Sequence, residues 1–124
     1  MSRDYRISDS ELLSNKHFPV KAVFNMVPDC RFKNIIQSIS CNHGFGENYG
    51  SCVFWNDLDD YDKSNIQFYE GAEFGLNDGE EIIISYEELL YYLNVVCSKY
   101  CEDNPEDLAV INNYIKKFKK NNGL

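Results

Sequence analysis

The sequence lacks any long hydrophobic run, because no apolar stretch approaches the roughly 18 residues that a membrane-spanning helix needs. Its first ten residues are polar and charged, and they contain no apolar segment of the kind found in secretory signals. These absences predict a chain that neither enters a membrane nor is exported. We therefore expect it to act in the cytoplasm.

Cysteine and histidine are too few and too scattered to indicate a metal site. The five cysteines are an odd number, which in an unexported chain indicates free and mostly buried thiols. Cys97 and Cys101 share one face of an expected helix, but a zinc site needs about four ligands. The two histidines, His17 and His43, lie far away in the sequence. We expect both cysteines to pack in the core, and we predict no metal or other cofactor.

No pattern singles out catalytic residues. Cys41 and His43 are near neighbours, yet a nucleophile and its base are normally brought together by the fold rather than by adjacency in sequence. The aspartates of residues 57–62 resemble a calcium loop, but Asp62 stands at the glycine position of that motif and Phe68 at its glutamate position. We predict that the protein is not an enzyme. A looser cation site, or a metal-dependent hydrolase built on these aspartates, is the alternative.

Positive charge is scarce in the middle of the chain. Residues 57–88 contain eleven acidic residues and one lysine, whereas the segments on either side each carry a net charge of +1. Such a field repels nucleic acid and anionic membranes and attracts basic proteins or cations. A general role in solubility is the alternative explanation. The acidic residues are Asp57, Asp59, Asp60, Asp62, Glu70, Glu73, Asp78, Glu80, Glu81, Glu87 and Glu88.

The sequence does contain enough apolar material for one core. Its 124 residues are 44% hydrophobic and 15% aromatic, which suits a domain that folds without metals or disulfides. We predict a single domain over residues 1–124. Residues 1–16 are polar and are expected to form a loosely held arm.

The spacing of apolar residues predicts two helices before the acidic segment and two after it. The first covers residues 18–27, and the second follows a capping Asp29 and covers residues 30–40. A capping box at Ser85 begins the third helix, and Pro105 in a first turn begins the fourth.

Three β-strands are expected between these pairs of helices, and residues 56–65 are expected to form a polar acidic loop. The hairpin is predicted to have a three-residue loop, because that register pairs Phe74 with Ile82 and gives one apolar face. This order predicts an α+β fold, in which a small antiparallel sheet of about three strands packs with roughly four helices, two N-terminal and two C-terminal. The expected strands are residues 51–55, 66–76 and 80–85.

Aromatic residues are interleaved with the acidic ones. They stand at Trp55, Tyr61, Phe68 and Tyr69. Protein interfaces favour aromatic anchors within a polar rim, and carboxylates steer a basic partner toward them. The alternative is that Trp55 and Phe68 belong to the core, which we expect of at least one of them.

Two blocks of sequence resemble a known family. The first runs from Met26-Val27-Pro28-Asp29 through Phe32-Lys33 to the segment 54–62, and the second covers residues 73–89. Together they resemble the immunity proteins of contact-dependent growth inhibition (CDI) systems that neutralise ribonuclease toxins. The resemblance implies a non-catalytic cytosolic protein that binds the C-terminal toxin domain of a delivered effector and blocks its RNA-cleaving site.

The expected partner is therefore a toxin domain, and neither nucleic acid nor a membrane. We expect the acidic segment to occupy the toxin's basic active site much as phosphates do. A small acidic scaffold or regulatory subunit that binds a basic protein is the alternative. The residues expected to bind the toxin are Asp57, Asp59, Asp60, Tyr61, Asp62, Tyr69, Glu70, Glu73, Asp78, Glu80 and Glu81.

Overall fold

The computed structural model describes residues 6–124 and has the α+β architecture that the sequence predicts. Its helices are α1 (Phe18–Met26), α2 (Asp29–Ser40), α3 (Asp60–Asn65), α4 (Tyr86–Asp103) and α5 (Leu108–Asn121). Its strands are β1 (Phe45–Gly46), β2 (Gly50–Phe54), β3 (Ala72–Leu76) and β4 (Glu81–Ile84). The order of the pairs of helices around the sheet is thus confirmed.

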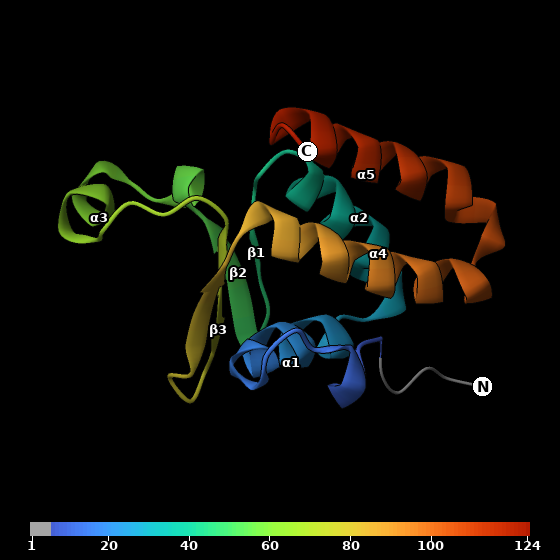
Figure 1. The fold of residues 1–124 in the computed structure, drawn as a ribbon, viewed down its shortest axis with the longest axis horizontal. Coiled ribbons are helices and arrows are strands. Elements are labelled where there is room, and N and C mark those ends of the chain that lie inside the picture. The colour runs from blue at the N-terminus through green and yellow to red at the C-terminus, as the bar shows by residue number, and fades with distance from the viewer. Residues whose placement is uncertain (1–5) are drawn as a thin grey trace.

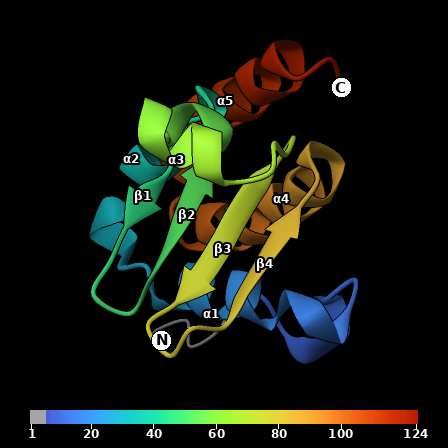
Figure 2. The ribbon, with the colours of Figure 1, turned by 90° about the vertical axis from the view of Figure 1, so that its left-hand side faces the viewer.

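The four strands form one antiparallel sheet in the order β1-β2-β3-β4. Helices α1, α2, α4 and α5 all lie on one side of this sheet, as Figure 1 shows. Seen from the other side, the sheet faces the viewer, and only α3 stands in front of one of its ends (Figure 2). The sheet therefore has an inner face that is covered by helices and an outer face that, among residues 6–124, no helix covers.

The core lies between the inner face and the helices. Phe74 of β3 packs against Phe24 of α1, with ring centroids 5.5 Å apart, and both side chains are fully buried. At the other end of the sheet the ring of Tyr86 lies between Phe54 of β2 and Phe118 of α5, at 6.5 and 6.2 Å. Burying side chains of this size stabilises the fold by about 2–3 kcal/mol each.

The hairpin has the register that the sequence predicts. Phe74 pairs with Ile82 and Ala72 pairs with Ile84, so these side chains all face inward. Gly79 has a φ of +96°, the left-handed conformation expected for the glycine of a three-residue loop.

Three local predictions about the sheet region are corrected. Residues 6–124 contain four strands rather than three, because a two-residue strand, β1, forms within the glycine-rich loop of residues 41–49, between α2 and β2. The strand predicted to begin at residue 66 is β3, which begins at Ala72, because Gly71 turns the chain with a φ of +133°. The acidic loop contains the short helix α3, which Asp59 caps by accepting a hydrogen bond of 2.8 Å from the N–H of Asp62.

Asp29 has a different role from the predicted one. It is the first residue of α2, follows Pro28 at the cap position, and makes no capping hydrogen bond. Its carboxylate instead forms an ion pair with Arg6.

Residues 6–16 pack against the helices, whereas the sequence predicts a loosely held arm. The Arg6 guanidinium donates to the carbonyl oxygens of Phe24 and Val27, at 2.8 and 2.6 Å, and lies over the Phe32 ring. Ile7 is fully buried in the core. The sequence alone did not predict these contacts, because they join residues that lie about 20 positions apart. Residues 1–5 of the predicted arm lie outside the described residues.

In the described part of the chain, no helix combines the length and the apolar character needed to cross a membrane.

Candidate functional site

The segment between β2 and β3 projects from one end of the sheet and carries α3 (Figure 1). Asp60, Tyr61 and Asp62 lie in the first turn of α3, where carboxylates are favoured by the positive end of the helix dipole. Tyr61 is 75% exposed. The local fold thus places an aromatic ring between carboxylates on a projecting element.

Asp57 lies in the same segment, but its carboxylate makes hydrogen bonds within the protein. Its Oδ2 accepts hydrogen bonds of 2.8 Å from the backbone N–H groups of Gly44 and Phe54. Its Oδ1 lies 3.3 Å from Nδ1 of His43. Asp57 therefore ties the projecting segment to the glycine-rich loop.

The aromatic residues around this segment form a small cluster. The Trp55 ring meets the rings of Phe68 and Tyr69 edge to face, with centroids 5.1 and 5.6 Å apart. Tyr69 is buried and its hydroxyl donates to the carbonyl oxygen of Val53 at 3.0 Å, and burial is the main cause that raises the pKa of this phenol to about 12.

The expectation that Trp55 or Phe68 belongs to the core is wrong. Trp55 is half-buried and Phe68 is 60% exposed. The cluster lies at the end of the sheet that is nearer to α3 and not among the other helices. Phe68 and part of Trp55 therefore remain exposed to solvent.

The outer face of the sheet consists of two rows of side chains, which follow from the strand register because alternate residues point to opposite faces. One row crosses all four strands and contains small residues that end at a carboxylate. The other crosses β2, β3 and β4. The first row is Gly46, Ser51, Gly75 and Glu81, and the second is Val53, Glu73 and Ile83.

Glu73 and Glu81 are diagonal neighbours on this outer face. Partial burial raises the pKa of Glu73 above its ordinary value, and the negative charge of Glu81 raises it further. A cation bound beside Glu73 would therefore stabilise its charged form, and the adjacent Ile83, which is 45% exposed, supplies apolar surface.

Asp78 and Glu80 lie in the β3–β4 hairpin, at the opposite end of the sheet from α3. The Asp78 Oδ1 accepts a hydrogen bond of 2.9 Å from the N–H of Glu80, which stabilises the turn. Both residues are exposed. Carboxylates thus occur at both ends of the outer face and on it.

The structure brings together most, but not all, of the residues expected to bind a toxin. Asp59, Asp60, Tyr61 and Asp62 lie at one end of the outer face, Glu73 and Glu81 on it, and Asp78 and Glu80 at the other end. Asp57 and Tyr69 make internal contacts instead. Glu70 lines a separate hollow with Glu87 and Leu124.

Two exposed apolar residues near these carboxylates were missed, Ile66 and Ile83, which are each 45% exposed. Phe68, which the sequence offered either as an aromatic anchor or as a core residue, is 60% exposed. The predicted register already implied that Ile83 points to the face of Glu73, because it lies between the inward-facing Ile82 and Ile84. Ile66 and Phe68 lie outside regular elements, so no periodicity indicated their direction.

The Cys41–His43 pair is not assembled as a catalytic pair. The Cys41 Sγ lies 3.8 Å from the hydroxyl of Ser40, and a hydrogen bond with Lys117 lowers the pKa of the thiol. His43 contacts Asp57 instead. Each side chain thus has its own partner.

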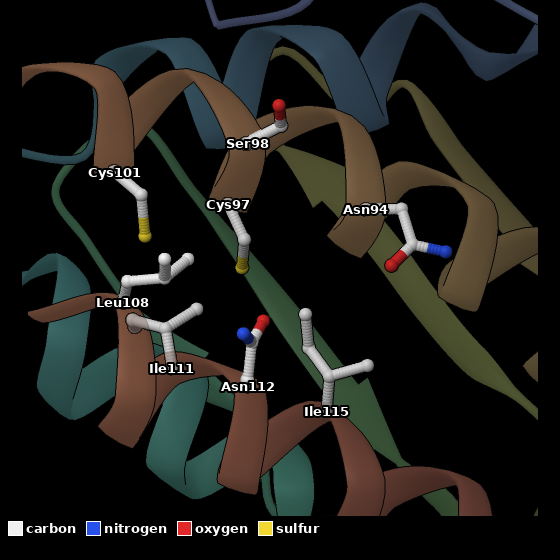
Figure 3. Close-up of a pocket in the computed structure, with 8 residues that line it drawn as sticks. All are labelled: Asn94, Cys97, Ser98, Cys101, Leu108, Ile111, Asn112 and Ile115. Atoms are coloured by element: carbon white, nitrogen blue, oxygen red, sulfur yellow. The ribbon is translucent and has the colours of Figure 1, made fainter. Parts of the chain in front are cut away.

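Cys97 and Cys101 point from α4 into a groove of about 220 Å³ that α5 closes (Figure 3). Both are buried members of the hydrophobic core, as predicted, and burial raises the pKa of each thiol. All five cysteines are free. Within residues 6–124, no group of three or more His, Cys, Asp or Glu residues is placed to hold a metal ion.

Comparison with known proteins identifies a family that the chain matches over most of its length. The family model described as "CDI immunity protein" matches residues 16–115 of the chain. A search of curated proteins finds no match. The matched region contains α1 to α4, the whole sheet and most of α5.

CDI immunity proteins are not enzymes, and they neutralise a cognate CDI toxin by binding its toxin domain. The match therefore favours this expectation over the scaffold and the metal-dependent hydrolase. The chain belongs to the CDI immunity protein family.

Proposed function

We propose that the cognate toxin is a ribonuclease and that this protein neutralises it by covering its RNA-cleaving site with an acidic surface. The acidic surface comprises the exposed and partly exposed carboxylates of α3 and its cap, the outer face of the sheet and the β3–β4 hairpin. Its residues are Asp59, Asp60, Asp62, Glu73, Asp78, Glu80 and Glu81.

The observation that carries the proposal is the placement of these carboxylates along one side of the molecule. The last turn of α5, by contrast, contains Lys119 and Lys120, and α5 lies in the helical layer on the other side of the sheet (Figure 1). An enzyme that cleaves RNA is expected to be basic around its active site, because it must attract phosphates. The acidic surface is complementary to such a site.

Surface charge that is complementary to a partner acts mainly on the association rate constant. Electrostatic steering raises association rate constants to on the order of 10⁸ M⁻¹s⁻¹ at low salt. The exposed aromatic rings of Tyr61 and Phe68 supply the apolar contacts that slow dissociation. Since such a toxin acts on RNA inside the cell, we place the inhibitor in the cytoplasm.

The test is an RNA-cleavage assay with the toxin domain that is encoded directly upstream of this protein. Purified toxin domain is incubated with total cellular RNA while the full-length protein is titrated in. We expect cleavage without the protein and loss of cleavage once the two are equimolar.

Two results contradict the proposal. If the toxin domain cleaves no RNA but kills cells by another route, the ribonuclease assignment is wrong. If RNA is cleaved at the same rate with and without excess protein, inhibition at the RNA-cleaving site is wrong.

A further inference from the structure

Two glycines on the outer face of the sheet are not required by the fold. A Cβ atom added at Gly46 would meet no atom within 4 Å, and one added at Gly75 would only reach ordinary contact with the Glu81 Cβ at 3.8 Å. Neither glycine has a positive φ. At Gly50, on the inner face, a Cβ would instead lie 2.6 Å from the Gly75 carbonyl oxygen.

Glycine inside a strand weakens a sheet, because it contributes no packing and loses more backbone freedom on folding. Internal packing explains Gly50 but leaves Gly46 and Gly75 unexplained. Such glycines mark places where another backbone or ligand approaches closely. Together with Ser51 they form a shallow row, about 14 Å long for four strands, whose floor is nearly free of side chains.

Charge indicates what this surface accepts. The row ends at Glu81, and Glu73 stands diagonally beside it, at a Cα spacing of about 7–8 Å. A cation between these two carboxylates relieves their mutual repulsion. The flanking Val53 and Ile83 offer apolar surface to the aliphatic part of a long basic side chain.

We propose that a lysine- or arginine-bearing segment of the toxin domain lies across the outer face of the sheet, over Gly46, Ser51 and Gly75, with its cation between Glu73 and Glu81. This inference rests on the proposed function, because it takes the partner to be a basic toxin. The inference selects one part of the acidic surface, the outer face of the sheet, as the docking face. In this arrangement α3 lies at one end of the docking face and the β3–β4 hairpin at the other.

The first pair of test variants fills the row without disturbing the fold. Gly75→Thr and Gly46→Thr add a β-branched side chain where the structure has room, so we expect thermal unfolding temperatures equal to or above that of the wild type. We expect the dissociation constant for the upstream-encoded toxin domain to rise by about tenfold or more, because the added atoms hold the partner away. Ala109→Thr, at an exposed position of α5, is the control for added bulk.

The second set removes charge. Glu73→Gln with Glu81→Gln is expected to weaken the complex by about tenfold or more, and the loss should exceed that of the distant control Glu106→Gln. Both sets of variants are measured as full-length protein by titration calorimetry.

The inference is supported if the row-filling and charge variants unfold at or above the temperature of the wild type, lose affinity for the toxin domain and differ in this from both controls. It is overturned if they bind as tightly as the wild type. That result leaves the proposed function intact, provided the wild type still blocks RNA cleavage. Conversely, a toxin domain that cleaves no RNA refutes the proposed function, whereas the binding data on the variants still decide the docking face.

Discussion

The carboxylate of Asp57 accepts a hydrogen bond of 2.8 Å from the backbone N–H of Gly44, and so joins the segment that carries α3 to the loop between α2 and the sheet. The same oxygen accepts from the N–H of Phe54. An acidic residue in the middle of an acidic segment thus serves the fold. Its neighbours Asp59, Asp60 and Asp62 either cap α3 or lie in its first turn.

Asp57→Ala should therefore lower the free energy of unfolding by about 2 kcal/mol, because two backbone N–H groups lose their acceptor. Urea unfolding followed by circular dichroism measures this. Asp60→Ala is the matched control and should change stability by less than about 0.5 kcal/mol, since Asp60 is exposed. Equal effects of the two substitutions would contradict the role assigned to Asp57.

Arg6→Ala should destabilise the protein by about 3 kcal/mol, because the guanidinium serves two buried carbonyl oxygens, Asp29 and the Phe32 ring at once. The change is measured by urea unfolding. Lys16→Ala, at an exposed position of the same N-terminal segment, should have almost no effect. If Arg6→Ala were equally harmless, residues 6–16 would not be held as described.

Gly71 and Gly79 both have a positive φ, but they differ in the space around them. Substitution by alanine at each position therefore distinguishes the cost of backbone strain alone from the cost of strain with a steric clash. At Gly79 a Cβ meets nothing within 4 Å, and Gly79→Ala should cost about 1 kcal/mol. At Gly71 a Cβ would lie 1.9 Å from the Ile84 carbonyl oxygen, so Gly71→Ala should cost about 3 kcal/mol or more. Thermal unfolding of both variants gives the comparison, and similar losses would contradict the close approach of Gly71 to β4.

Glu73 should make stability depend on pH with a definite sign. Its pKa is raised in the folded protein, first by burial and then by Glu81, so folding favours its protonated form. Protonated Glu73 therefore contributes its full stabilisation of the fold below the ordinary carboxyl pKa. This contribution is lost as the pH rises through the raised pKa of the folded state.

Glu73→Gln should therefore stabilise the free protein more at pH 7 than at pH 4, relative to the wild type. Urea unfolding at the two pH values checks this, with Glu106→Gln as the control. A stabilisation of the same size at both pH values would contradict the shifted pKa.

The elements that the sequence predicted well are those with strong local signals. The capping box at Ser85 and the apolar stripe after it gave α4, and hydrophobic parity gave the register of Phe74 with Ile82. Both depend on neighbours within a few residues or on one hairpin.

The features that sequence reasoning missed depend on contacts between distant residues. The strand β1 has only two residues and is defined by its pairing with β2. The N-terminal segment is held by contacts of Arg6 with α1 and α2. Charge alone also could not distinguish Asp60 from Asp57, whose carboxylate accepts hydrogen bonds from two backbone N–H groups.

The association rate constant with the upstream-encoded toxin domain tests the acidic surface most directly, measured by stopped flow at about 0.01 M and about 0.15 M salt. The wild type should associate much faster at low salt, and Asp60→Asn with Asp62→Asn should reduce both the rate and its salt dependence, whereas the distant Glu106→Gln should change neither. A rate that is the same for all three proteins and indifferent to salt would contradict the account.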